Sequence, residues 1–270
     1  MKLTLAYSPC PNDTFIFDAM VHHKVDTEGL EFEVQLHDVE ALNVMAFDNK
    51  VDVTKLSYNA FLHLYKIYAL LSSGSALGEK CGPLLIAKHD KIKSFNAQSL
   101  VAIPGKYTTA NSLFSLVFPN NTNTKEMLFS EIEDAILKGD VDAGVIIHEN
   151  RFTYQEKGLE KLLDLGEYWE EQTQLPIPLG GIVVSKSLDS SVQKKIQRVL
   201  RRSIEFAFKF PKESHDYVKQ HAQEMDIDVM NSHIQLYVNE YSLDLGDKGR
   251  EAVCYLFDRK GISKNDLEII

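Results

Sequence analysis

The chain has 270 residues, 44% of them hydrophobic, with a formal net charge of −10 and three cysteines. This length exceeds the ~150 residues of an average domain and predicts two lobes, while the acidic excess argues against nucleic acid or an anionic membrane as partner, since both reward clustered Lys and Arg. The odd number of widely spaced cysteines, the short N-terminal apolar stretch and the lack of any ~18-residue apolar run indicate a cytoplasmic protein without a signal peptide or membrane span.

The first half of the chain alternates short apolar runs with segments of helical spacing, which is typical of an α/β protein. We expect strands at 3–7, 31–37, 52–56, 69–73 and 83–88, and helices at 13–23, 39–48 and 58–66. A second series has strands at 99–103 and 142–147 and helices at 108–118, 130–138 and 150–157. After a strand at 180–185 the chain becomes helical, at 189–210, 213–223, 227–241 and 247–260.

The turn after the first strand, Ser8–Phe15, holds two prolines, a thiol and two residues able to cap a helix. Each proline removes a backbone donor and fixes φ, and Asn12 or Asp13 can cap the helix that follows. In open α/β sheets such turns bind ligands, and a helix N-terminus favours anionic groups. Cys10 is more typical of a packed thiol than of a nucleophile, because no cationic neighbour in sequence would lower its pKa.

In two pairs of segments, the first member is similar to the second. Ser8–Thr14 resembles Pro104–Thr109, because each is a turn between a strand and a helix. Asn49–Ser57 resembles Lys138–His148, because each has a turn that contains Asp, then a strand, and then a polar residue. We therefore expect two α/β lobes with a ligand cleft between them. The larger, discontinuous lobe would comprise residues 1–87 and 181–270, and the smaller lobe residues 88–180. The stretch Leu175–Gly181 would be a crossing between the lobes or a plain loop.

His148 is the strongest catalytic candidate from spacing alone, because it follows a strand of buried type. An unperturbed imidazole, with a pKa of ~6.5, can act as a general base near neutral pH. A histidine that only hydrogen-bonds at a strand end is an equally open interpretation. Thr108, Thr109 and Ser57 can cap helices, bind a carboxylate, or do both.

Other chemistries have weaker support in the sequence. Ser57 lacks the GxSxG context of a serine hydrolase. The pair His22 and His23, like Cys81 and His89, lacks the spacing of a metal site, so no metal is expected. Neither GxGxxG nor a P-loop occurs, and no cofactor is expected. The aromatic stripe of Tyr58, Phe61, Tyr65 and Tyr68 has the spacing of a core helix face.

Several motifs together resemble the 1,4-dihydroxy-6-naphthoate synthases of the futalosine route to menaquinone. They are SPCPNDTF at Ser8–Phe15, TKLSY at Thr54–Tyr58, PGKYTTA at Pro104–Ala110, IIHENRFTY at Ile146–Tyr154, the stretch Leu175–Gly181, and YVNEYSLDLG at Tyr237–Gly246. The resemblance implies a two-lobed fold like that of type II periplasmic binding proteins, and conversion of cyclic dehypoxanthine futalosine to 1,4-dihydroxy-6-naphthoate. It implies that His148 accepts a proton and that substrate is bound by Lys55, Leu56 and Ser57 and by Thr109 and Ala110.

The expected function is thus that of a cofactor-independent lyase acting on a small carboxylate. A non-catalytic protein of the same architecture that binds small carboxylates is the alternative, and a ligand-sensing domain is a third interpretation that lacks any appended output module. The resemblance implies no role for residues 117–128, because they match none of the family's motifs.

Overall fold

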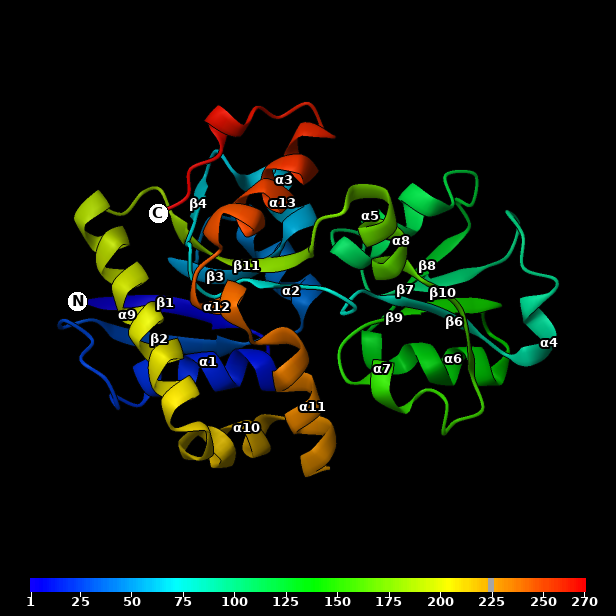
Figure 1. The fold of residues 1–270 in the computed structure, drawn as a ribbon, viewed down its shortest axis with the longest axis horizontal. Coiled ribbons are helices and arrows are strands. Elements are labelled where there is room, and N and C mark those ends of the chain that lie inside the picture. The colour runs from blue at the N-terminus through cyan, green and yellow to red at the C-terminus, as the bar shows by residue number, and fades with distance from the viewer. Residues whose placement is uncertain (223–225) are drawn as a thin grey trace. The chain divides into compact units, whose positions relative to one another are not determined.

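The computed structural model describes residues 1–222 and 226–270, so the last residue of the helix expected at 213–223 lies outside the described residues. The chain forms two compact units (Figure 1). Unit 1 comprises Met1–Gly78 and Pro178–Ile270, and unit 2 comprises Glu79–Ile177. Among the helices in the described ranges, none has the length and apolar character needed to cross a membrane.

Unit 1 is built on a mixed sheet in which the order is β2-β1-β3-β11-β4, with β5 paired to β11. Its strands are β1 (Lys2–Tyr7), β2 (Glu31–Leu36), β3 (Val53–Ser57), β4 (Tyr68–Leu70), β5 (Ala76–Gly78) and β11 (Ile177–Ser185). Strand β1 runs parallel to β2 and β3, whereas β11 runs antiparallel to β3 and β4. The carboxyl ends of β1 and β3 therefore lie at the same edge of the sheet.

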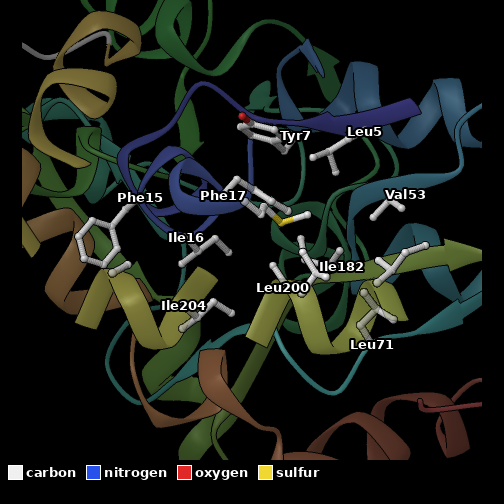
Figure 2. Close-up of a cluster of buried hydrophobic side chains, with 14 of the residues drawn as sticks. Leu5, Tyr7, Phe15, Ile16, Phe17, Val53, Leu71, Ile182, Leu200 and Ile204 are labelled. Atoms are coloured by element: carbon white, nitrogen blue, oxygen red, sulfur yellow. The ribbon is translucent and has the colours of Figure 1, made fainter. Parts of the chain in front are cut away.

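Helices α1 and α9 cover one face of this sheet, and α3 and α13 lie on the other (Figure 1). The helices of unit 1 are α1 (Pro11–Val21), α2 (Val39–Phe47), α3 (Tyr58–Leu64), α9 (Ser190–Lys209), α10 (His215–His221), α11 (Ile227–Tyr237), α12 (Glu240–Leu243) and α13 (Gly246–Asp258), with 3₁₀ turns η2 (Pro211–Ser214) and η3 (Lys264–Asp266). Helix α1 packs on α9, α10 and α11. Between α9 and the sheet lies the main core, in which Leu5, Ile182 and Leu200 are among the fully buried side chains (Figure 2).

Unit 2 has its own sheet, of order β10-β6-β9-β7-β8. Its strands are β6 (Leu84–Ala87), β7 (Val101–Ile103), β8 (Thr124–Glu126), β9 (Ala143–Ile146) and β10 (Glu160–Asp164). Its helices are α4 (His89–Ile92), α5 (Thr109–Val117), α6 (Ile132–Lys138), α7 (Asn150–Thr153) and α8 (Leu165–Thr173), with the 3₁₀ turn η1 (Phe129–Glu131). Helices α5 and α8 lie on one face of the sheet and α6 and α7 on the other (Figure 1). Trp169 of α8 is buried and donates its indole N–H to the carbonyl of Pro176 at 3.3 Å.

The boundaries between the two units, after Gly78 and after Ile177, lie nine and three residues before the expected ones. Strand β6 was expected in the first lobe, but it pairs with β9 and β10 and therefore belongs to unit 2. The stretch Leu175–Gly181, expected as a crossing or a plain loop, contains the boundary between the two units, which falls after Ile177. It leads into β11, which tolerates Pro178 because the pairing with β3 begins at Gly180. Tyr58 and Phe61 are buried core residues of α3, as their spacing predicted. Tyr65 is only partly buried, and Tyr68 is buried on β4 and not on the expected helix. The ligand cleft expected between the lobes stays a prediction.

Candidate functional site

The first cluster of candidate residues, called here the first edge, lies in unit 1 where the parallel strands β1 and β3 end. Ala6 pairs with Thr54 in the register of the two strands. Consequently the turn that begins at Ser8 comes next to Lys55 and Ser57. These residues come from two separate sequence motifs, and the sheet brings them together.

Asp13 is the centre of the first edge. Its Oδ2 accepts a hydrogen bond from the Ser8 hydroxyl at 2.8 Å, and its Oδ1 accepts from Asn12 at 2.8 Å and from the Lys55 ammonium at 2.9 Å. The Lys55 and Asp13 side chains are only 8% and 2% exposed, so they form a buried ion pair. Asp13 is not the cap of α1: Cys10 occupies the N-cap position, and Pro11 begins the helix, two residues before the expected start.

Gly180 makes room for the Lys55 side chain. Strand β11 pairs with β3 so that Gly180 lies opposite Ser57, and a Cβ added at Gly180 would come within 3.2 Å of the Lys55 Cε and 2.8 Å of the Leu56 carbonyl oxygen. A residue with a side chain would therefore force the β3 backbone and the lysine to move. The absence of a side chain at Gly180 is therefore part of the structure of the first edge.

Ser57 and Leu56 have clear structural roles. The Ser57 hydroxyl caps α3 by accepting a hydrogen bond from the backbone of Ala60 at 3.2 Å, and the Ser57 backbone N–H donates to Asn43 at 3.0 Å. Leu56 is fully buried in β3. The capping role expected for Ser57 is confirmed, and its binding role stays a prediction.

His233 joins the first edge from far along the chain. It is fully buried on α11, and its Nε2 lies 2.9 Å from Oδ1 of Asn12, within hydrogen-bond distance. The sequence analysis missed this residue because α11 follows β1 by more than 200 residues, and only tertiary packing of α1 on α11 brings the two together. Asn12 thus has one partner in its own turn, Asp13, and one in the C-terminal helices.

The second cluster, called here the second edge, lies in unit 2 where β7 and β9 end. These strands are parallel neighbours, with Val101 opposite Ala143, so the segments that follow them lie at one edge. Thr108 caps α5: its hydroxyl oxygen accepts from the backbone of Asn111 at 3.2 Å and its O–H donates to the carbonyl of Gly105 at 2.8 Å. Thr109 and Ala110 are the buried first residues of α5.

His148 lies two residues beyond β9 and has a left-handed backbone, with φ of 58°. Such a conformation in a residue other than glycine costs about 1–3 kcal/mol and is often found at functional sites. The half-buried imidazole packs edge-on against Phe129, with ring centroids 4.9 Å apart and an angle of 68° between the rings. The ring orientation is therefore restricted by an aromatic neighbour from η1.

The segment after His148 is held by Arg151 and Asn150. The Arg151 guanidinium donates to the carbonyl of Lys80 at 2.8 Å, to Asp164 at 2.9 Å and to the carbonyl of Gly82. Asn150 donates its amide N–H to the buried carboxylate of Glu133 on α6 at 2.6 Å. The sequence did not identify Arg151 or Asn150 as residues that hold this segment, because no local pattern marks a side chain whose hydrogen-bond partner lies on another element.

Tyr7 and Cys81 are poorly suited to proton transfer at neutral pH. Burial, together with the Tyr217 hydroxyl 2.6 Å away, raises the pKa of Tyr7 far above its usual range. Burial also raises the pKa of the Cys81 thiol to about 12.

Structural comparisons identify the fold. A crystal structure of a protein from Archaeoglobus fulgidus is 36% identical to this chain, with a TM-score of 0.89, and the match covers 96% of this chain and 98% of that one. A Candida albicans protein described as having the generic periplasmic binding protein fold gives a TM-score of 0.67 at 13% identity, covering 97% of this chain and 90% of that one. A ligand-binding component of an ABC-type import system from Staphylococcus aureus gives 0.73 at 13% identity, covering 99% and 96%. The chain therefore has a periplasmic-binding-protein-like α/β fold.

Sequence comparisons identify the family. A family model described as menaquinone biosynthesis matches residues 3–261. The chain is 42% identical to a protein named 1,4-dihydroxy-6-naphthoate synthase from Thermus thermophilus, over 94% of this chain and 92% of that protein. It is also 42% identical to one of the same name from Streptomyces coelicolor, over 95% of this chain and 92% of that protein. The chain belongs to the menaquinone biosynthesis family whose members include these two synthases.

Proposed function

We propose that the chain is a lyase that converts cyclic dehypoxanthine futalosine to 1,4-dihydroxy-6-naphthoate in menaquinone biosynthesis. The observation that carries the proposal is the 42% identity, over nearly the whole chain, to two proteins named as 1,4-dihydroxy-6-naphthoate synthases. The motifs SPCPNDTF, TKLSY, PGKYTTA and IIHENRFTY fall where strands β1, β3, β7 and β9 end. These sequence motifs therefore coincide with the two edges that carry the polar candidates.

His148 is the proposed general base. Opening a cyclic precursor to an aromatic naphthol, with release of its sugar-derived carbons, requires proton abstraction and stabilisation of an enolate or oxyanion. A well-placed base contributes about 100- to 10,000-fold to the rate of such a step. The position of His148 after β9, its left-handed backbone and its packing against Phe129 support this role, because all three restrict where the imidazole can lie.

Lys55, Leu56 and Ser57 of the first edge and Thr109 and Ala110 of the second are the proposed substrate-binding residues. The positive charge of Lys55 is balanced by Asp13 at 2.9 Å, which favours a polar contact over the binding of a second carboxylate. Thr109 and Ala110 occupy the first two positions of α5, where backbone N–H groups have no acceptor within the helix. We therefore assign the substrate carboxylate to the start of α5.

The test is turnover of cyclic dehypoxanthine futalosine by purified protein, with the naphthoate product measured by chromatography. We expect wild type to form product and His148→Ala to lose at least about 100-fold in kcat. His89→Ala is the matched control, because this histidine of unit 2 is exposed and pairs only on the surface with Glu160. Its activity should equal that of wild type.

Two other outcomes would change the proposal. Product formation by His148→Ala at the wild-type rate would remove His148 as the base. Absence of turnover by wild type, combined with tight binding of a small carboxylate, would favour the alternative of a non-catalytic carboxylate-binding protein.

A further inference from the structure

We propose that Glu133 is a positioning residue for His148 and acts through Asn150. The inference rests on the proposed function, in which His148 is the general base. It concerns three residues of unit 2 that the family resemblance does not connect, and it starts from the backbone of His148.

The left-handed backbone of His148 needs support from both sides, since non-glycine residues favour other conformations. On the N-terminal side, β9 is fixed between β6 and β7. On the C-terminal side, the chain turns directly into α7, which begins at Asn150 and has only four residues. A helix this short does not hold itself in place, so a side-chain contact has to do so.

Glu133 supplies one such contact, in addition to the hydrogen bonds that Arg151 makes with the carbonyls of Lys80 and Gly82 and with Asp164. The amide nitrogen of Asn150 donates to Oε2 of Glu133 at 2.6 Å, and the ammonium of Lys157 donates to the same oxygen at 2.6 Å. Glu133 has no exposed surface and Asn150 is 8% exposed. A hydrogen bond to a buried, charged acceptor is stronger and shorter than one between neutral groups, so it restrains Asn150 firmly.

The same helical segment also touches the imidazole. Phe129 in η1 precedes Glu133 by one helical turn, and its ring packs against His148. Helix α6 is seated close to β9 at Gly144, where an added Cβ would overlap Ile132 and lie 3.0 Å from Cδ1 of Ile136. The helix that carries Glu133 and the strand that leads to His148 are thus packed in direct contact (Figure 1).

Steady-state kinetics test the inference through the split between kcat and KM. We expect Asn150→Ala and Glu133→Leu to lower kcat by ~10- to 100-fold while KM changes by less than about threefold, because a displaced base slows the chemical step more than it weakens binding. Glu133→Gln keeps an amide oxygen that accepts from Asn150 and should retain most of kcat. Asp134→Asn is the matched control, since this neighbour on α6 is 63% exposed and should leave both constants unchanged.

A spectroscopic measurement tests the inference without relying on turnover. The protein has nine histidines, and the ring signals of His148 in a histidine-labelled sample can be assigned by their loss in His148→Ala. We expect these signals to shift in Asn150→Ala and Glu133→Leu. Lys157→Ala removes the ion pair but leaves the bond between Asn150 and Glu133, so the His148 signals should stay in place.

Unchanged His148 signals in Asn150→Ala would overturn the inference. Equal shifts in Lys157→Ala and Asn150→Ala would also overturn it, because the effect would then follow from the ion pair and not from Asn150. If His148→Ala instead proves fully active, the general base is wrong, yet the signals still report whether Glu133 and Asn150 position this ring.

Discussion

At the scale of single residues, the first edge depends on a buried ion pair. Neither Asp13 nor Lys55 has more than a tenth of its side chain exposed, and Asp13 also accepts bonds from Ser8 and Asn12. A buried pair of this kind adds little net stability compared with apolar packing, but removal of one partner leaves an uncompensated charge. The pair therefore fixes the position of the lysine more than it stabilises unit 1.

We expect Asp13→Asn to lower the free energy of unfolding by about 3–5 kcal/mol, because it leaves the Lys55 ammonium buried without a counter-ion. Urea denaturation of the substrate-free protein measures the change. Asp13→Asn with Lys55→Met should recover a large part of the loss. Asp48→Asn serves as control, since the Lys50–Asp48 pair is 78% and 65% exposed and is worth about 0–1 kcal/mol. A loss in Asp13→Asn no larger than in this control would contradict the expectation.

The sequence predicted the types of residue at the two edges better than their partners. Thr108 and Ser57 cap helices as expected, because capping depends on neighbours three residues away. The contacts of Asn12 with His233 and of Asn150 with Glu133 span 221 and 17 residues. Such contacts depend on how helices pack on the sheets, which the spacing of apolar residues does not specify.

At the scale of elements, the contact of α6 with β9 depends on a glycine. We expect Gly144→Ala to lower the free energy of unfolding by about 1–3 kcal/mol, because the added Cβ would overlap Ile132. Chemical denaturation measures this change. In Gly144→Ala with Ile132→Ala the loss should be smaller than the sum of the two single losses, since removal of the isoleucine makes room for the new methyl group. Strict additivity would show that the two residues do not interfere.

The sequence analysis missed four elements of unit 2 that bury few side chains, and also the short buried strand β5 of unit 1. Strand β8 is exposed along its whole length, and β10 begins with two exposed charged residues, so neither shows an alternating pattern. The four-residue helix α4 contains no buried residue. Helix α8 was missed because its sequence is mostly polar, with Trp169 and Leu165 as its main buried side chains. All four elements belong to unit 2.

At the scale of the whole molecule, the cysteines mark separate regions. Cys10 is 4% exposed in unit 1, and Cys81 is 1% exposed in unit 2, where burial raises its pKa to about 12. Cys254 on α13 is partly exposed. We expect the native protein to react rapidly with a thiol reagent at Cys254 alone and the unfolded protein at all three, because buried thiols that stay protonated react slowly.

Mass spectrometry of the modified protein measures this order in increasing urea. Modification of Cys81 and of Cys10 reports loss of the burial described for each thiol. Cys254→Ser is the control and should abolish the rapid native reaction. Rapid modification of Cys81 in the native protein would contradict the burial described for it.

Trp169 is the only tryptophan of the chain. It lies in α8, and its indole contacts the carbonyl of Pro176 just before β11 leaves unit 2. Indole emission from this protein therefore originates entirely in unit 2 and is sensitive to the last residues before the chain crosses to unit 1. The wavelength of the tryptophan emission therefore reports the environment of α8 in unit 2, while unit 1 contributes no indole signal.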